Sequence, residues 1–196
     1  MGLASSIPAD SRGGCTLFEP GQHIVHPAHG AGTIIDIVEQ EMSTGFSQYY
    51  VIEFPEQRMT IHLPVERTDE IGLRKVMTEA KFDNVLAILS EEPQKLPNDY
   101  KQRRQQVEEM VNSGAPAEVA RALRELTWQQ EKKPLNNADS RLMSEARSKL
   151  VQEIALATDE DPSEIHAKID DALERAVAAK REAIEEAEEE EDDSDE

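Results

Sequence analysis

Cysteine, aromatic residues and long apolar segments are scarce in this 196-residue sequence, and each scarcity excludes something. Cys15 is the only cysteine, so the chain can form no internal disulfide, and a reducing compartment is expected. Aromatic residues make up only 4% of the chain, which means that any core must be mainly aliphatic. No apolar run approaches the roughly 18 residues that a membrane helix needs, and the N-terminus shows no secretory signal pattern. We therefore expect a cytoplasmic protein.

Positive charge is scarce too: 21 Lys and Arg stand against 41 Asp and Glu, a formal net charge of -20. So acidic a chain argues at first against a nucleic-acid partner. The acidity is unevenly placed, however, because residues 182–196 hold eleven acids and no base, which leaves -9 for the first 181 residues. Residues 98–150 hold ten bases and eight acids. The net charge therefore does not decide what the folded part binds.

The first part of the chain has the pattern of β-strands. In MTIHLP (residues 59–64) apolar and polar residues alternate, which places Ile61 toward a core and His62 on the opposite face. YYVIEF (residues 49–54) shows the same alternation, with every second residue from Tyr50 on one face. Short antiparallel strands this close together predict a small β-barrel of the SH3 or Tudor type.

From residue 76 the apolar period changes to about 3.6 residues, which is the period of helices. Phe82, Val85 and Leu89 begin the first such stripe. Gly114 is expected to end one helix, and Pro116 to lie in the first turn of the next. The sequence thus predicts an α+β chain with four parts: a flexible leader, a β-barrel, a helical bundle and a disordered acidic tail, at residues 1–17, 18–75, 76–181 and 182–196.

The segment HIVHPAHG (residues 23–30) contains three of the five histidines, which raises the question of a metal site. Structural zinc sites use about four ligands, usually cysteines or two separated ligand pairs, and the sequence offers neither. Residues three apart in an extended segment also lie on alternate faces. We therefore expect no metal site and no cofactor. The alternative is a strand that ends at Pro27, followed by a tight turn that uses Gly30 and Gly32.

The same segment carries a family resemblance. FEPGQHIVHPAHGAGTIIDI resembles the opening motif of the CarD family of bacterial transcription regulators, and five residues fit that motif: Phe18, Gly21, Pro27, His29 and Gly30. The similarity continues through YYVIEF, TIHLPVE and IGLRKV, and into the late helix SRLMSEARSKLVQEIALA, so that it covers about residues 18–157. The resemblance identifies the histidine segment as a turn signature.

The resemblance implies that the β module contacts the β subunit of RNA polymerase through a strand edge. An exposed edge in a small barrel suits this kind of strand addition on physical grounds as well. The implied polymerase contacts fall on Gln40, Thr60, His62 and Pro64. Gln40 and His62 stand where the family often has basic residues.

For DNA, the family has a tryptophan wedge followed by basic residues, and here PNDYKQRRQQ places Tyr100 at the wedge position. The implied DNA contacts are Tyr100, Lys101, Arg103 and Arg104, with Lys132 and Lys133 as further candidates beside Trp128. The alternative is that Tyr100 packs at a helix start and the arginines form a solvated face. Trp128 fits core packing or a partner contact.

The resemblance predicts a transcription regulator that binds polymerase and the upstream edge of the promoter bubble, and so stabilises the open complex. DNA recognition would rest on shape and phosphate contacts, since no predicted helix presents a base-reading set of Arg or Asn. A second hypothesis is a protein-interaction adaptor that binds no DNA. No P-loop and no nucleophile motif is present, so an enzyme is not expected. We expect a monomer that associates with the bacterial nucleoid.

Overall fold

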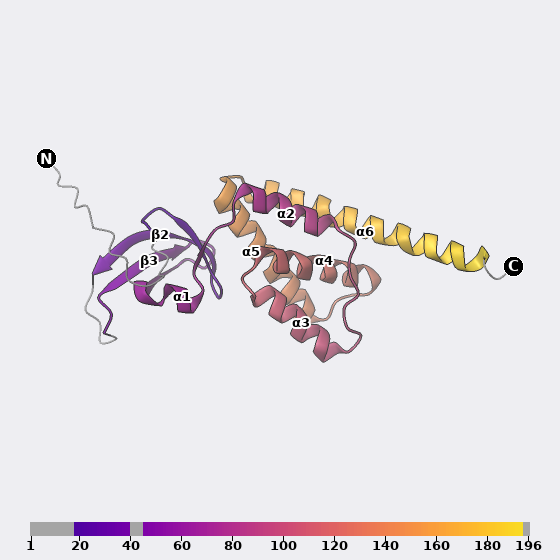
Figure 1. The fold of residues 1–196 in the computed structure, drawn as a ribbon, viewed down its shortest axis with the longest axis horizontal. Helices are drawn as coiled ribbons and strands as arrows, with labels where there is room; N and C mark the ends of the chain where they lie inside the picture. The colour runs from indigo at the N-terminus through magenta and orange to yellow at the C-terminus, as the bar shows by residue number, and fades with distance from the viewer. Residues whose placement is uncertain (1–17, 40–44, 194–196) are drawn as a thin grey trace.

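A computed structural model describes residues 18–39 and 45–193 of the chain, with side chains as far as residue 187. The predicted leader and Gln40 lie outside the described residues. An antiparallel five-stranded sheet comes first and a set of helices follows (Figure 1), so the predicted α+β class is confirmed.

The strands pair in the order β4-β3-β2-β1-β5, and each neighbouring pair is antiparallel. They are β1 (His23–His26), β2 (Gly30–Glu39), β3 (Gln48–Phe54), β4 (Met59–Pro64) and β5 (Arg74–Lys75). The register of β2 against β3 shifts between Ile34 and Asp36, which marks a β-bulge. Because β4 and β5 stand at the two ends of the described sheet, closure into a barrel stays a prediction.

The chain passes from β4 to β5, at the opposite edge, through a short helical connection. It consists of the 3-10 turn η1 (Val65–Arg67) and helix α1 (Thr68–Ile71), and Gly72 ends it in the left-handed conformation at φ 80°. Glycine adopts this φ without strain from a Cβ atom. Val65 and Leu73 are buried in the core of the sheet, so the connection covers one side of that core.

The core of the β module follows the strand alternation that the sequence predicts. Ile61 packs against a cluster of buried residues, whereas its neighbour His62 is exposed. The cluster consists of Phe18, Ile24, Ile34, Tyr50, Ile52, Phe54, Leu63, Val65 and Leu73. Tyr49 and Val51 belong to the opposite face of β3 and are also buried, so side chains on both faces of this central strand are shielded from water.

Five longer helices form the second module. They are α2 (Glu79–Ser90), α3 (Tyr100–Asn112), α4 (Pro116–Lys132), α5 (Asn137–Thr158) and α6 (Pro162–Asp193). Asp99 caps α3 by accepting a hydrogen bond from the Gln102 N–H, and Pro116 is the first residue of α4. Gly114, between these helices, has φ 72°, so the predicted break at this glycine is confirmed.

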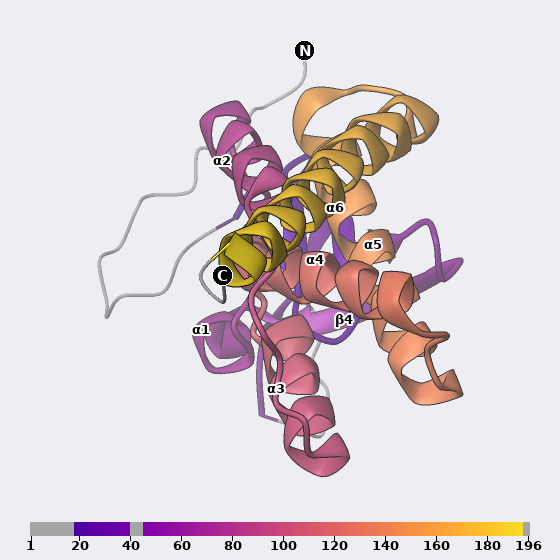
Figure 2. The same cartoon turned by 90° about the vertical axis from the view of Figure 1, so that its right-hand side faces the viewer.

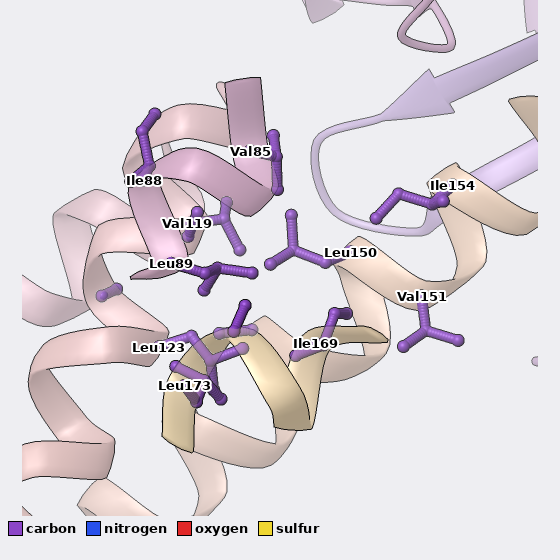
Figure 3. Packing of buried hydrophobic residues seen from close by; sticks show 14 of the residues in the cluster. Val85, Ile88, Leu89, Val119, Leu123, Leu150, Val151, Ile154, Ile169 and Leu173 are labelled. Carbon is purple, nitrogen blue, oxygen red and sulfur yellow. The ribbon is translucent and has the colours of Figure 1, made fainter. Parts of the chain in front are cut away.

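Aliphatic side chains from four helices meet in the centre of the helical module (Figure 3). Leu89 of α2, Leu123 of α4, Leu150 of α5 and Ile169 of α6 are all buried there. α6 lies across α2, α4 and α5 and contacts all three of them (Figure 2). The stripes of period 3.6 therefore become one shared core.

The acidic end of the chain differs from the prediction. Disorder was expected from residue 182, whereas α6 continues as a helix to Asp193 and projects beyond the other helices (Figure 1). Its N-terminal half is buried through Ile165 and Ile169, so the costly first turn of the helix is already formed. Glu and Ala, which dominate the extension, have high helix propensity and continue the helix at little cost.

Candidate functional site

Three of the four polymerase contacts that the resemblance implies lie on an edge strand. β4 pairs with β3 on one side and has no described strand on the other. Thr60 and His62 are exposed, Pro64 is half-buried, and the two-residue period places all three on one face. The free backbone groups of such an edge can pair with a strand of another protein. Gln40 lies outside the described residues, so its position relative to this edge stays a prediction.

The histidine segment forms the β1–β2 turn. Gly30 has φ 76°, and a Cβ atom on Gly32 would lie 2.7 Å from the backbone oxygen of Glu53, so glycine is required at both positions. The rings of His26 and His29 lie 4.6 Å apart between centroids, and burial, followed by the charge of His29, lowers the pKa of His26. No group of three or more potential metal ligands occurs within residues 18–39 and 45–193.

Tyr100 is the first residue of α3, and its side chain is 43% exposed. The Arg103 guanidinium lies 5.7 Å from the centroid of its ring, a cation–π arrangement. All eight Phe, Tyr and Trp residues of the chain lie in the described part, and Tyr100 is the exposed one among them. The position therefore presents a ring to the solvent that is supported on one side by a buried cation.

Arg103, one of the implied DNA contacts, is buried. The residue is 8% exposed, and its Nη1 donates hydrogen bonds to the carbonyl oxygens of Pro97 and Asn98. Its Nε lies 3.9 Å from Oδ2 of Asp139, which is itself buried and accepts a hydrogen bond from Asn136. A guanidinium with these partners is turned into the fold and not toward the solvent, where a phosphate would lie. Its recognisable contact with the exposed part of α3 is the Tyr100 ring.

A sequence signal for this burial exists. Arg103 stands four residues before Val107 and eight before Val111, and both valines are fully buried on the inner face of α3. The spacing alone places Arg103 on that inner face. A charged residue on an apolar stripe is buried when a partner is available, and Asp139 supplies that partner from α5.

Two exposed arginines lie close together on α3 and α5. Arg104 is exposed, as predicted, and forms an ion pair with Glu108 at 3.9 Å. Arg141 of α5, which no sequence motif singles out, lines the same cleft as Arg104 and is exposed. Lys101 is exposed one position after Tyr100. Glu108 and Glu145 line the same cleft, so this surface carries both cations and carboxylates.

Lys132 and Lys133 lie at the C-terminal end of α4 and are exposed. A three-residue turn joins α3 to α4, and the two helices pack together, so the end of α4 lies toward the start of α3. Trp128 is 7% exposed, with the Lys132 ammonium 5.3 Å from its ring centroid, which favours packing over a partner contact. Arg181 of α6 pairs with Glu131, so the acidic extension begins near these lysines.

The comparisons with known proteins agree with these two modules. A family model described as CarD-like/TRCF RID domain matches residues 18–77, and one described as CarD, C-terminal domain matches residues 84–170. A curated relative, "Putative transcription factor YdeB" of Bacillus subtilis (strain 168), is 29% identical over 140 residues, which cover 70% of this chain and 90% of the relative. Both domains of one family occur here in sequence, so the chain belongs to the CarD family, whose members regulate transcription.

Proposed function

We propose that this protein docks on the β subunit of RNA polymerase through β4 and contacts promoter DNA through its helical module, so that the open complex is stabilised. The observation that carries the proposal is the exposed Tyr100 ring at the start of α3, a helix that also presents the exposed Lys101 and Arg104. An apolar ring can insert at an unstacked base step, and the neighbouring cations can hold the backbone phosphates. Such binding needs no catalytic step and no cofactor.

The polymerase contact is proposed to form by strand addition to β4. Main-chain hydrogen bonds would supply most of the affinity, and the exposed Thr60 and His62 side chains would add specificity. The edge is short, and its strand ends at Pro64, which donates no backbone hydrogen bond. The same features protect a free β4 from aggregating with other copies. The protein would act in the bacterial cytoplasm, at the nucleoid.

A second candidate function is an adaptor that binds polymerase and a basic protein but no DNA. The acidic extension of α6 favours the adaptor function. The Arg181–Glu131 ion pair places the start of this extension near Lys132, and its negative charge would repel the phosphates of DNA there. The two candidates differ in whether the helical module touches DNA.

One experiment separates them. Polymerase is first captured with the tagged protein, and open-complex lifetime is then measured on one promoter with and without the protein. Binding of forked promoter DNA is followed in parallel as a function of salt. A longer lifetime and a salt-sensitive shift of the forked DNA support the first function, because phosphate contacts weaken as salt rises. Polymerase capture with neither effect supports the adaptor.

A further inference from the structure

Arg74, in the last strand of the sheet, forms an ion pair with Glu153 of α5 at the junction of the two modules. Its Nη1 and Nη2 lie 2.5 Å and 2.8 Å from the two carboxylate oxygens, so the pair is bidentate. The Glu153 side chain is 5% exposed and that of Arg74 is 32% exposed. This geometry is the strong form of an ion pair, and it is largely shielded from water.

The remaining polar groups of this pair bind three further points of the chain. Arg74 Nε donates to the Gly114 carbonyl oxygen, in the α3–α4 turn, at 2.8 Å. Nη1 also donates to the carbonyl oxygen of Lys75. Glu153 Oε1 accepts a hydrogen bond from the Met77 N–H at 2.8 Å, just before α2 begins. One guanidinium and one carboxylate therefore connect the sheet to the α3–α4 turn, to α5 and to the segment that enters α2.

The surroundings leave little freedom for the two modules to move. Val25 and Pro27 of the β module line a small cleft together with Val119 and Leu150 of the helical module, and the ion pair borders it. A Cβ atom on Gly30 would lie 3.0 Å from Gln152 Oε1, so the β1–β2 turn lies directly against α5. The covalent link is only the segment between Lys75 and the start of α2. Such a short link can bend unless noncovalent contacts fix it.

We propose that Arg74 and Glu153 are positioning residues: they fix the orientation of the two modules so that β4 and the exposed Tyr100 ring reach polymerase and DNA together. This inference rests on the proposed function. β4 lies at the sheet edge opposite β5, which carries Arg74, so any rotation at the junction displaces β4 relative to Tyr100. Fixing two sites in one geometry raises the effective concentration of the second contact once the first has formed.

Two conservative variants test this in the full chain. Arg74→Lys keeps the positive charge but removes the planar guanidinium, which donates hydrogen bonds to Glu153 and to the Gly114 carbonyl oxygen at the same time. Glu153→Gln keeps the shape and an acceptor for the Met77 N–H but loses the charge. The matched control is Arg147→Lys, which changes the Arg147–Asp170 pair between α5 and α6, inside the helical module. Thermal melting and circular dichroism verify that each variant is folded.

Module orientation is measured by energy transfer between dyes on Glu56→Cys and Gln130→Cys in a Cys15→Ser background; Glu56 and Gln130 are exposed and lie in different modules. The same unlabelled variants are assayed for polymerase affinity and open-complex lifetime. We expect both junction variants to broaden the distance distribution and to shorten the lifetime at least about fivefold, the lower end of typical coupling between sites. Polymerase affinity and the Arg147→Lys control should not change.

Other outcomes overturn the inference. A broad dye-distance distribution in the junction variants with an unchanged open-complex lifetime would show that module orientation does not affect the lifetime. A distribution as narrow as that of the unmodified protein would show that the Arg74–Glu153 pair does not set the orientation. Failure of both junction variants to fold would make the pair a folding element instead. If the unmodified protein does not lengthen the lifetime at all, the proposed function fails, and the positioning role fails with it. The energy-transfer result then still reports whether the pair sets the orientation.

Discussion

Replacing Tyr100 with alanine should shorten open-complex lifetime while leaving the fold nearly intact. Tyr100 is 43% exposed, and the Arg103 guanidinium lies 5.7 Å from the centroid of its ring. A cation–π contact at such an exposed site contributes about 0.5 to 1 kcal/mol, so the loss of unfolding free energy should be about that size. Stacking of an aromatic ring on a base contributes about 1 to 3 kcal/mol. The lifetime should therefore fall by roughly fivefold to a hundredfold.

The assay measures dissociation of preformed open complexes after a competitor is added, at a protein concentration that saturates polymerase. Tyr100→Phe keeps the ring and should behave as the unmodified protein does, because the hydroxyl is not part of the wedge. Tyr100→Trp should lengthen the lifetime, since a larger ring covers more of the exposed base. Gln106→Ala, at an exposed position of the same helix, is the matched control and should change nothing.

Two results would refute this reasoning. An unchanged lifetime for Tyr100→Ala, with polymerase still bound, would remove the wedge role from this position. A large fall in melting temperature would show instead that the ring is needed for the fold. Binding of polymerase alone is the discriminating control, because a wedge acts on DNA and should leave that affinity unchanged.

Four further predictions concern other parts of the chain. His62→Glu should weaken polymerase binding and leave the melting temperature unchanged. Ile61→Ala should instead lower the free energy of unfolding by about 1 to 3 kcal/mol. If both variants destabilise the fold equally, the two faces of β4 are wrongly assigned. Arg104→Ala should weaken DNA binding on all sequences and reduce its salt dependence, and an unchanged salt slope would argue against a phosphate contact. Deleting residues 182–196 should leave the fold intact and raise or maintain DNA affinity, because eleven acids are removed; a clear fall in affinity would contradict this. Burial lowers the pKa of His26 below 6.5, so as the pH falls His26 is protonated more readily in the unfolded chain than in the folded one. The free energy of unfolding should therefore be unaffected by His26 above pH 6.5 and should decline below it. Melting from pH 7.5 to 5.5 should show a smaller decline for a folded His26→Gln variant, and an equal decline would exclude His26 as the cause.

The sequence by itself determined the local structure. The two-residue period of a strand puts Ile61 and His62 on opposite faces, and the apolar side chain is the one that faces the core. The helix break at Gly114 and the restart at Pro116 depend on the φ values that these residues accept. The β1–β2 turn likewise follows from glycines within a few positions of one another. Each of these features is decided by residues that are neighbours along the chain.

The cooperativity of helix formation explains why α6 extends into the acidic run. The run of acids after residue 181 predicts disorder when it is considered alone, because like charges repel and little apolar surface is available. In the structure the run continues a helix that Ile165 and Ile169 already anchor in the core. Extending an existing helix costs far less than starting one. The acidic run is therefore helical because the preceding turns of α6 are packed in the core.

The burial and the partners of the charged residues in the candidate sites depend on tertiary structure. Arg103 was expected to bind phosphate, and it is buried because α5 brings Asp139 beside it. Arg141 gained its place beside Arg104 because α3 and α5 pack together. Arg74 and Glu153 are 79 positions apart in the chain, yet they form one ion pair. The partner of a charged side chain, and hence its burial and its role, is fixed only when distant segments come into contact.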